Sequence, residues 1–146
     1  MERYKMSTIL IVEDNPSDLR LMMRAFKKSN LTNDLATAID GEQALDYLFG
    51  QDGDEYRHAL PVLILLDIKL PKIDGLEVLE KIRNHERTQM LPVVILTSSK
   101  EQEDVARSYK LGVNSYIRKP VDFNHFVEAV QQMGLYWLVL NESPFH

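Results

Sequence analysis

A chain of 146 residues with 45% hydrophobic content has the length of one domain and enough apolar side chains to form a core. It has no apolar run of the roughly 20 residues that a membrane-spanning helix needs and no signal-peptide pattern, and the lack of cysteine excludes disulfides and thiolate metal sites. A net charge of −5 without a dense Lys/Arg cluster argues against nucleic acid or an acidic membrane as the main partner. We therefore expect a cytoplasmic, single-domain protein.

Short apolar runs alternate with helical patterns along the chain. The first run, Thr8 to Val12, is followed by two acids, and Asn15-Pro16 then supplies the N-cap and first residue of a helix. The run from Val62 to Leu66 has five apolar residues, which is typical of a strand buried on both faces. Strands are predicted over residues 8–12, 34–38, 62–67, 92–97 and 115–118, and helices over 16–28, 42–49, 75–83, 101–111 and 121–136.

This alternation predicts a parallel sheet with helices on both faces, which is a doubly wound α/β fold. We place the domain at residues 7–140, with a flexible N-terminus at 1–6 and a tail at 141–146. An acidic, aperiodic loop from Gly50 to Leu60 precedes the central strand and is long for this kind of fold. In such sheets the ligand site lies at the carboxyl ends of the strands.

Chemically useful side chains stand at the ends of four predicted strands. Glu13 and Asp14 follow the first strand, Asp67 ends the third, and Thr97 and Lys119 mark the ends of the fourth and fifth. Converging carboxylates repel one another unless a cation is present, and with a backbone carbonyl and water they form a ligand set for Mg²⁺. A lysine and a hydroxyl facing them can hold phosphoryl oxygens. The pattern therefore predicts Asp67 as a nucleophile that accepts a phosphoryl group.

Each of these residues also has an ordinary structural explanation. Aspartates after strands are often helix N-caps, Thr97 alone would be a turn hydroxyl, and Lys119 alone a solvated lysine. Tyr116, on the last predicted strand, is by default a half-exposed edge aromatic. Their coincidence at four strand ends favours a shared site over a set of unrelated structural roles.

At these residues the chain resembles the receiver domains of two-component response regulators. The resemblance implies a flavodoxin-like fold with strand order 2-1-3-4-5 and phosphorylation of Asp67 by a histidine kinase. It runs from about Ser7 to Met133 and is carried by four motifs that are highly specific together. These are Ile-Leu-Ile-Val-Glu-Asp at 9–14, Leu-Asp-Ile-Lys-Leu-Pro-Lys-Ile-Asp-Gly at 66–75, Ile-Leu-Thr-Ser at 95–98 and Tyr-Ile-Arg-Lys-Pro at 116–120.

The resemblance also implies the roles of the site residues. Asp14, Asp67 and the backbone carbonyl of Lys69 would hold Mg²⁺, while Thr97 and Lys119 would contact the phosphoryl group. The peptide bond that follows Lys119 is expected to be cis.

A conformational switch is implied as well. After phosphorylation the Thr97 hydroxyl would move towards the phosphoryl oxygens and Tyr116 would swing inward. This would repack the surface formed by residues 101–111, 115–118 and 121–136. Lys69 and Ser99 flank the place where the rate of phosphoryl loss is tuned.

Two departures from the commonest family pattern matter. The acid pair is Glu13-Asp14 instead of two aspartates, and the longer Glu13 ranks below Asp14 as a direct ligand and would reach the metal through water. The long loop before the central strand, together with residues 114–116 and 134–141, is similar to the small regulators paired with bacterial phytochromes. The kinase is therefore expected to be phytochrome-like.

The end of the chain can be interpreted from its residues alone. Phe126, Val130, Met133 and Trp137 share one helical stripe, which by default faces the core. Tyr136 to Leu140 adds five consecutive apolar residues, which need a partner surface. Two alternatives stay open: this end packs back on the domain, or with the last helix it forms a homodimer contact.

Only 26 residues follow Pro120, too few for an output domain, so we expect a stand-alone phosphoacceptor that assists only its own phosphorylation and dephosphorylation. The alternative is a Mg²⁺-dependent phosphohydrolase or phosphotransferase with an aspartyl-phosphate intermediate. Such enzymes usually carry an acid two residues after the nucleophile, where this chain has Lys69. A flavodoxin-like cofactor binder would need a phosphate-cradling loop after the first strand, and the sequence lacks one.

Overall fold

The computed structural model describes residues 8–29, 33–50, 58–98, 102–119 and 122–133. Within these ranges, strands and helices alternate as predicted, and the strands form one parallel sheet in the order β2-β1-β3-β4-β5. The elements are β1 (Thr8–Val12), α2 (Pro16–Lys28), β2 (Asp34–Ala38), α3 (Gly41–Phe49), β3 (Leu63–Leu66), α4 (Gly75–Arg83), β4 (Val93–Thr97), α5 (Gln102–Lys110), β5 (Ser115–Arg118) and α6 (Phe123–Met133). The predicted doubly wound α/β fold with strand order 2-1-3-4-5 is confirmed.

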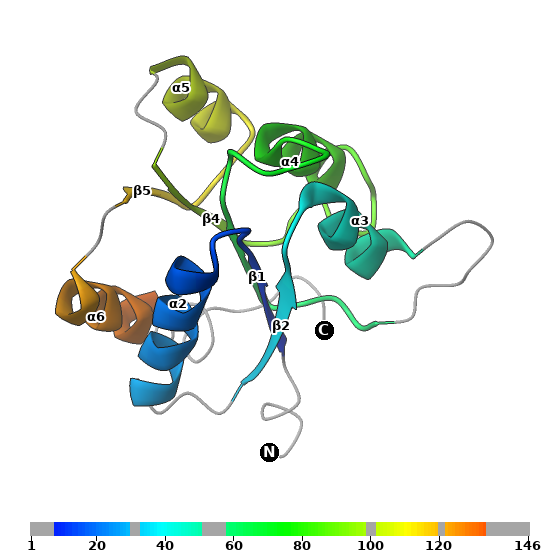
Figure 1. Ribbon diagram of the computed structural model, residues 1–146. Helices are drawn as coiled ribbons and strands as arrows, with labels where there is room; N and C mark the ends of the chain where they lie inside the picture. Colours follow the sequence, from blue (N-terminus) through cyan, green and yellow to red (C-terminus); the bar gives the residue numbers. More distant parts are fainter. Residues whose placement is uncertain (1–7, 30–32, 51–57, 99–101, 120–121, 134–146) are drawn as a thin grey trace.

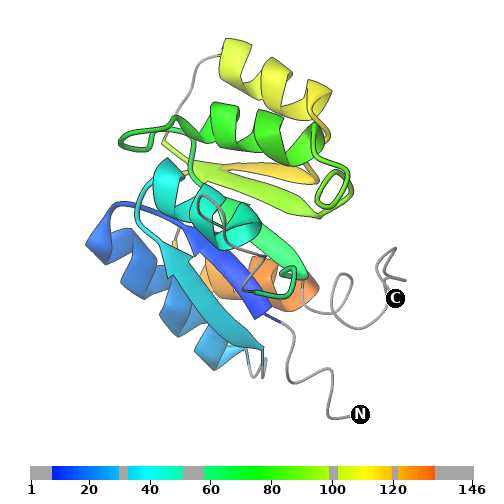
Figure 2. The same cartoon turned by 90° about the vertical axis from the view of Figure 1, so that its right-hand side faces the viewer.

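Helices cover both faces of the sheet (Figures 1 and 2). α2 and α6 lie side by side on one face, and α3, α4 and α5 lie on the other. Successive residues of a strand point to opposite faces, so Ile9 and Ile11 of β1 pack with the α2/α6 layer, whereas Leu10 and Val12 pack with the α3/α4 layer. The two cores explain why β1, β3 and β4 are continuous apolar runs.

Capping residues fix where three helices begin. The Asn15 side chain accepts a hydrogen bond from the Asp18 amide at 3.0 Å, and Pro16 follows as the first residue of α2, as predicted. Asp40 caps α3 through the Gln43 amide at 2.8 Å, and Asp74 caps α4 in the same manner. All three caps follow strands at the same edge of the sheet, so the positive ends of these helix dipoles point to that edge.

Close packing holds α4 against the loop after β3. The Gly75 amide donates to the Ile68 carbonyl at 2.7 Å, and a Cβ at position 75 would stand 2.1 Å from the Asp67 carbonyl oxygen. Only glycine allows this approach, which fixes the backbone at the end of the central strand.

The predicted boundaries differ from the observed ones by one residue at most within the described ranges. β3 lacks Val62 and Asp67, although the amides of both still bond to β1 carbonyls, and β4 begins after Pro92, which has no amide hydrogen to donate. No described helix is long and apolar enough to cross a membrane. Several predictions fall outside the described residues: the flexible N-terminus, the tail, the Tyr136–Leu140 segment, Ser99, residues 51–57 of the long loop and the peptide bond before Pro120.

Candidate functional site

The sheet continues for one residue beyond three of its strands, and these residues carry the predicted site. The Glu13 amide donates to the Ala38 carbonyl at 2.9 Å and the Asp67 amide to the Val12 carbonyl at 3.1 Å. The Lys119 amide donates to the Thr97 carbonyl at 2.8 Å. Their backbones are therefore as fixed as the sheet itself, and the side chains emerge at its carboxyl edge.

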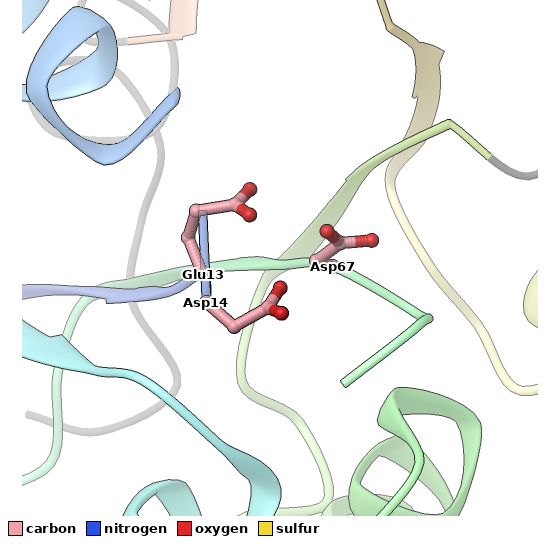
Figure 3. A group of neighbouring side chains, drawn as sticks. All are labelled: Glu13, Asp14 and Asp67. Carbon is pink, nitrogen blue, oxygen red and sulfur yellow. The ribbon is translucent and has the colours of Figure 1, made fainter. Parts of the chain in front are cut away.

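Three carboxylates meet at this edge (Figure 3). Glu13, Asp14 and Asp67 each offer one oxygen, and these oxygens all lie within 4.8 Å of one another. Glu13 is fully buried, Asp67 is 5% exposed, and Asp14 lies at the surface. A hard divalent cation prefers oxygen ligands, so the donor set and its access to solvent fit Mg²⁺ or Mn²⁺.

Lys119 lies beside this group and contacts three carboxylates. Its Nζ is 2.7 Å from Glu13 Oε1, 2.7 Å from Asp18 Oδ2 and 3.1 Å from Asp67 Oδ2. The structure thus places Lys119 beside Asp67, and its contact with a phosphoryl group stays a prediction. Asp18, from the first turn of α2, is a site residue that the sequence reasoning missed; its signal was an acid in the first turn of the helix that starts directly after the acid pair.

Burial has the largest effect on the pKa values of Glu13 and Lys119. Burial raises the pKa of Glu13 to about 7, although hydrogen bonds from Lys119 and from the Asn15 amide oppose this rise, and the charge of Asp67 adds to it. Burial lowers the pKa of Lys119, but the hydrogen bonds to Asp18 and Glu13 and the charge of Asp67 outweigh it and hold this pKa above its usual value. The lysine therefore stays charged, and the surplus of carboxylates favours a bound cation.

Glu13 uses both of its oxygens within the protein. Oε1 accepts from Lys119, and Oε2 accepts from the Asn15 amide at 3.1 Å. Asp14 is more exposed and lies closer to solvent. This division agrees with the ranking of Asp14 above Glu13 as a direct metal ligand, which stays a prediction.

The remaining predicted residues lie at or near the same edge. Thr97 is fully buried at the end of β4, next to β3 in the sheet, and Tyr116 is half-buried against the core on the α4 side. The Lys69 amide donates to Asp67 Oδ1 at 3.3 Å, while the Lys69 ammonium lies 3.5 Å from Asp104 at the start of α5. The loop after Asp67 therefore bonds to the Asp67 carboxylate and reaches α5.

Comparison with known proteins points to one family. The response regulator receiver domain matches residues 9–131. The probable methanogenesis regulatory protein FilR2 of Methanothrix harundinacea is 43% identical over 136 residues, covering 93% of this chain and 86% of FilR2. The response regulator Rcp1 of Synechocystis sp. (strain PCC 6803) is 39% identical over 130 residues, covering 89% of this chain and 88% of Rcp1.

Solved structures agree with the sequence relatives. The phosphorylated cyanobacterial phytochrome response regulator RcpA superimposes with a TM-score of 0.84 at 37% identity, covering 95% of this chain and 99% of RcpA. The Mn²⁺-bound form of Rcp1 gives a TM-score of 0.82 at 38% identity, covering 94% and 99% of the two chains. Fold, motif positions and relatives thus lead to the same conclusion: the chain belongs to the family of response regulator receiver domains.

Proposed function

We propose that this protein is a stand-alone response regulator that accepts a phosphoryl group on Asp67 from a histidine kinase in a Mg²⁺-dependent reaction. The observation that carries the proposal is the position of the Asp67 carboxylate, which lies beside two further carboxylates (Figure 3) and 3.1 Å from the ammonium of Lys119. A carboxylate in that position is close both to a group of oxygens that can bind a cation and to a fixed positive charge.

The transfer is an exchange of one bond to phosphorus for another. An oxygen of Asp67 attacks the phosphorus of a phosphohistidine, the O–P bond forms as the N–P bond breaks, and the kinase imidazole leaves with the electron pair and takes up a proton. Lys119 and the Thr97 hydroxyl hold the phosphoryl oxygens as charge shifts between donor and acceptor. Loss of the group reverses the modification when water attacks the phosphorus and the O–P bond breaks.

Divalent metal binding is the second part of the proposal. Asp14, Asp67 and the backbone carbonyl of Lys69 would hold Mg²⁺, with Glu13 contributing through a water molecule. When bound, the ion supplies positive charge that offsets the repulsion between the carboxylates and the phosphoryl oxygens. Support comes from the three clustered oxygens and from the relative Rcp1, which has been solved with Mn²⁺.

The output is a change in protein contacts. We infer that the Thr97 hydroxyl moves towards a phosphoryl group on Asp67 and that Tyr116 turns inward, which repacks the surface of α5, β5 and α6. The position of Tyr116 supports this, because the residue belongs to β5, is half-buried and packs against the core on the α4 side of the sheet. We also propose that the domain spans residues 7–140, that the protein lies in the cytoplasm and that it acts without nucleic acid. A homodimer through the last helix and Tyr136–Leu140 is part of the same proposal.

A phytochrome-like histidine kinase is the partner that we propose. The support is the likeness to RcpA, which is described as a cyanobacterial phytochrome response regulator. FilR2, a probable methanogenesis regulatory protein, is similar as well, so the kinase must be tested directly. Phosphotransfer from a purified phytochrome kinase that is faster than from an unrelated histidine kinase would support this partner, and equal rates would contradict it.

The core of the proposal is tested with acetyl phosphate and MgCl₂, followed by intact-mass measurement. We expect one phosphoryl adduct on the wild type, none on Asp67→Asn, and an unchanged adduct on Asp34→Asn, a matched control at an exposed aspartate far from the site. Addition of EDTA should suppress the reaction. An adduct that persists in Asp67→Asn would contradict the proposal, and so would many turnovers on an external phosphoester, which would indicate a phosphohydrolase.

A further inference from the structure

Lys119 has a full set of partners before any phosphoryl group is present. An ammonium group has three N–H donors, and three carboxylates surround Lys119 Nζ at 2.7, 2.7 and 3.1 Å. The side chain is 13% exposed, so water has little access to it. A phosphoryl group on Asp67 that is to be held by Lys119 must therefore compete with the carboxylates already there.

The three partners differ in how readily they can give up the lysine. Glu13 is fully buried, so water cannot readily replace the ammonium as the hydrogen-bond partner of its Oε1 atom, which would be left without a donor. Asp67 is the group that is modified. Asp18 has a side chain that is 37% exposed, so water can replace the ammonium there at little cost.

Asp18 also differs in where it comes from. Glu13 and Asp67 stand on the sheet, whereas Asp18 belongs to the first turn of α2, and its own amide is held by the N-cap Asn15. Its carboxylate holds Lys119 from the helix that packs beside α6. Asp18 is therefore not a member of the group formed by Glu13, Asp14 and Asp67 (Figure 3), although it shares Lys119 with two members of that group.

We propose that Asp18 is a positioning residue that holds Lys119 in the unphosphorylated protein and releases it to the phosphoryl group on Asp67. Asp18 then sets how readily the site accepts a phosphoryl group, because each gain in the Lys119–phosphoryl contact is offset by loss of the Lys119–Asp18 contact. This inference rests on the proposed function of Asp67, and it concerns a residue outside the four motifs that mark the family resemblance.

The test is the affinity for beryllofluoride, a phosphoryl mimic, measured by calorimetric titration of the full chain with MgCl₂ present. Asp18→Asn keeps the size of the side chain and removes its charge, so we expect about threefold to tenfold tighter binding. The matched control is Glu42→Gln, which removes a negative charge from α3 at the same edge but contacts Lys72 instead of Lys119. Its affinity should equal that of the wild type.

Salt separates a direct contact from a general charge effect. Exposed charges are screened over about 10 Å at 0.1 M salt and over shorter distances at higher salt. The gain in Asp18→Asn should therefore persist at 0.5 M NaCl. A gain that disappears at high salt, an equal gain in Glu42→Gln, or no gain at all would overturn the inference.

Folding and the underlying function are checked in the same experiment. Thermal unfolding verifies each variant, and Asp18→Ser, which also lacks the carboxylate, replaces Asp18→Asn if that variant does not fold. A wild type that binds beryllofluoride while Asp18 variants behave identically refutes the role of Asp18 alone. A wild type that neither binds beryllofluoride nor accepts a phosphoryl group refutes the proposed function and this inference with it.

Discussion

Two cations are enclosed at opposite edges of the sheet, and their partners differ in kind. Lys119, at the carboxyl edge, is surrounded by three carboxylates. Arg83, in the last turn of α4, donates to four backbone carbonyls in the segments that lead into β4 and β5, at the amino edge. The acceptors are those of Gln89, Leu91, Leu111 and Gly112, at distances from 2.7 to 3.1 Å.

The difference teaches how to tell a structural cation from a functional one. Carbonyl oxygens are neutral and fixed by the backbone, so Arg83 joins two loops permanently, and burial lowers its pKa. Carboxylates are charged and can exchange a lysine for a metal ion or water. We call the carboxyl edge with Lys119 the open edge, because the partners of its cation can be exchanged. We call the amino edge with Arg83 the closed edge, because the hydrogen bonds of its cation stay in place.

The largest effect on stability should come from removing the hydrogen bonds of Arg83 at the closed edge. Arg83→Ala leaves four carbonyls without their donor and frees the loops before β4 and β5, so we expect a loss of about 3 kcal/mol in the free energy of unfolding. Urea denaturation measures it. The folded fraction should still accept a phosphoryl group from acetyl phosphate. A variant as stable as the wild type would show that these hydrogen bonds add nothing beyond what water supplies.

At the open edge the corresponding change should affect chemistry more than stability. Lys119→Met removes the charge that holds the phosphoryl oxygens, and we expect phosphorylation by acetyl phosphate to slow about 100-fold, or about 2.7 kcal/mol in the activation barrier. With MgCl₂ present, the midpoint of thermal unfolding should fall less than in Arg83→Ala, because the metal takes over part of the carboxylate charge. An equal fall in both variants would make Lys119 a structural cation like Arg83.

Metal addition should stabilise the folded protein only by binding at the open edge. Mg²⁺ at ten times its dissociation constant should raise the free energy of unfolding of the wild type by about 1.4 kcal/mol. Asp14→Asn should lose most of this gain, whereas Arg83→Ala should retain it in full. Thermal unfolding with MgCl₂ or EDTA measures all three, and a gain that survives in Asp14→Asn would remove Asp14 from the metal site.

The open edge could largely be predicted from sequence, and the closed edge could not. Buried parallel strands are continuous apolar runs, and their carboxyl ends meet at one edge, so the acids after β1 and β3 and the lysine after β5 could be brought together without coordinates. Arg83 gave no signal because its acceptors are backbone carbonyls, which any residue supplies. The contact of Asp18 with Lys119 was not predicted, because the direction of the Asp18 side chain depends on the rotation of α2 about its axis. The packing of Met22, Ala25 and Phe26 on the sheet determines that rotation.

The smallest expected effect is a pH dependence that belongs to the open edge alone. Burial raises the pKa of Glu13 to about 7 from a value of 4.5 in the unfolded chain. Between these values the folded protein holds a proton that the unfolded chain has lost, so folding takes up a proton and stability falls as the pH rises. Without metal, the contribution of Glu13 between pH 5.5 and 6.5 should be a loss of about 1 kcal/mol.

Comparison of variants by urea denaturation isolates this contribution from other groups that titrate in the same range. Glu13→Gln should show a shallower pH dependence than the wild type in EDTA, while Arg83→Ala should show the same slope as the wild type from a lower starting stability. Saturating Mg²⁺ should reduce the wild-type slope, because a cation at the three carboxylates favours the charged form of Glu13 and lowers its pKa. Identical slopes for Glu13→Gln and the wild type would mean that Lys119 and the Asn15 amide compensate fully for the burial of Glu13. The open edge would then contribute no more to the pH dependence of stability than the closed edge does.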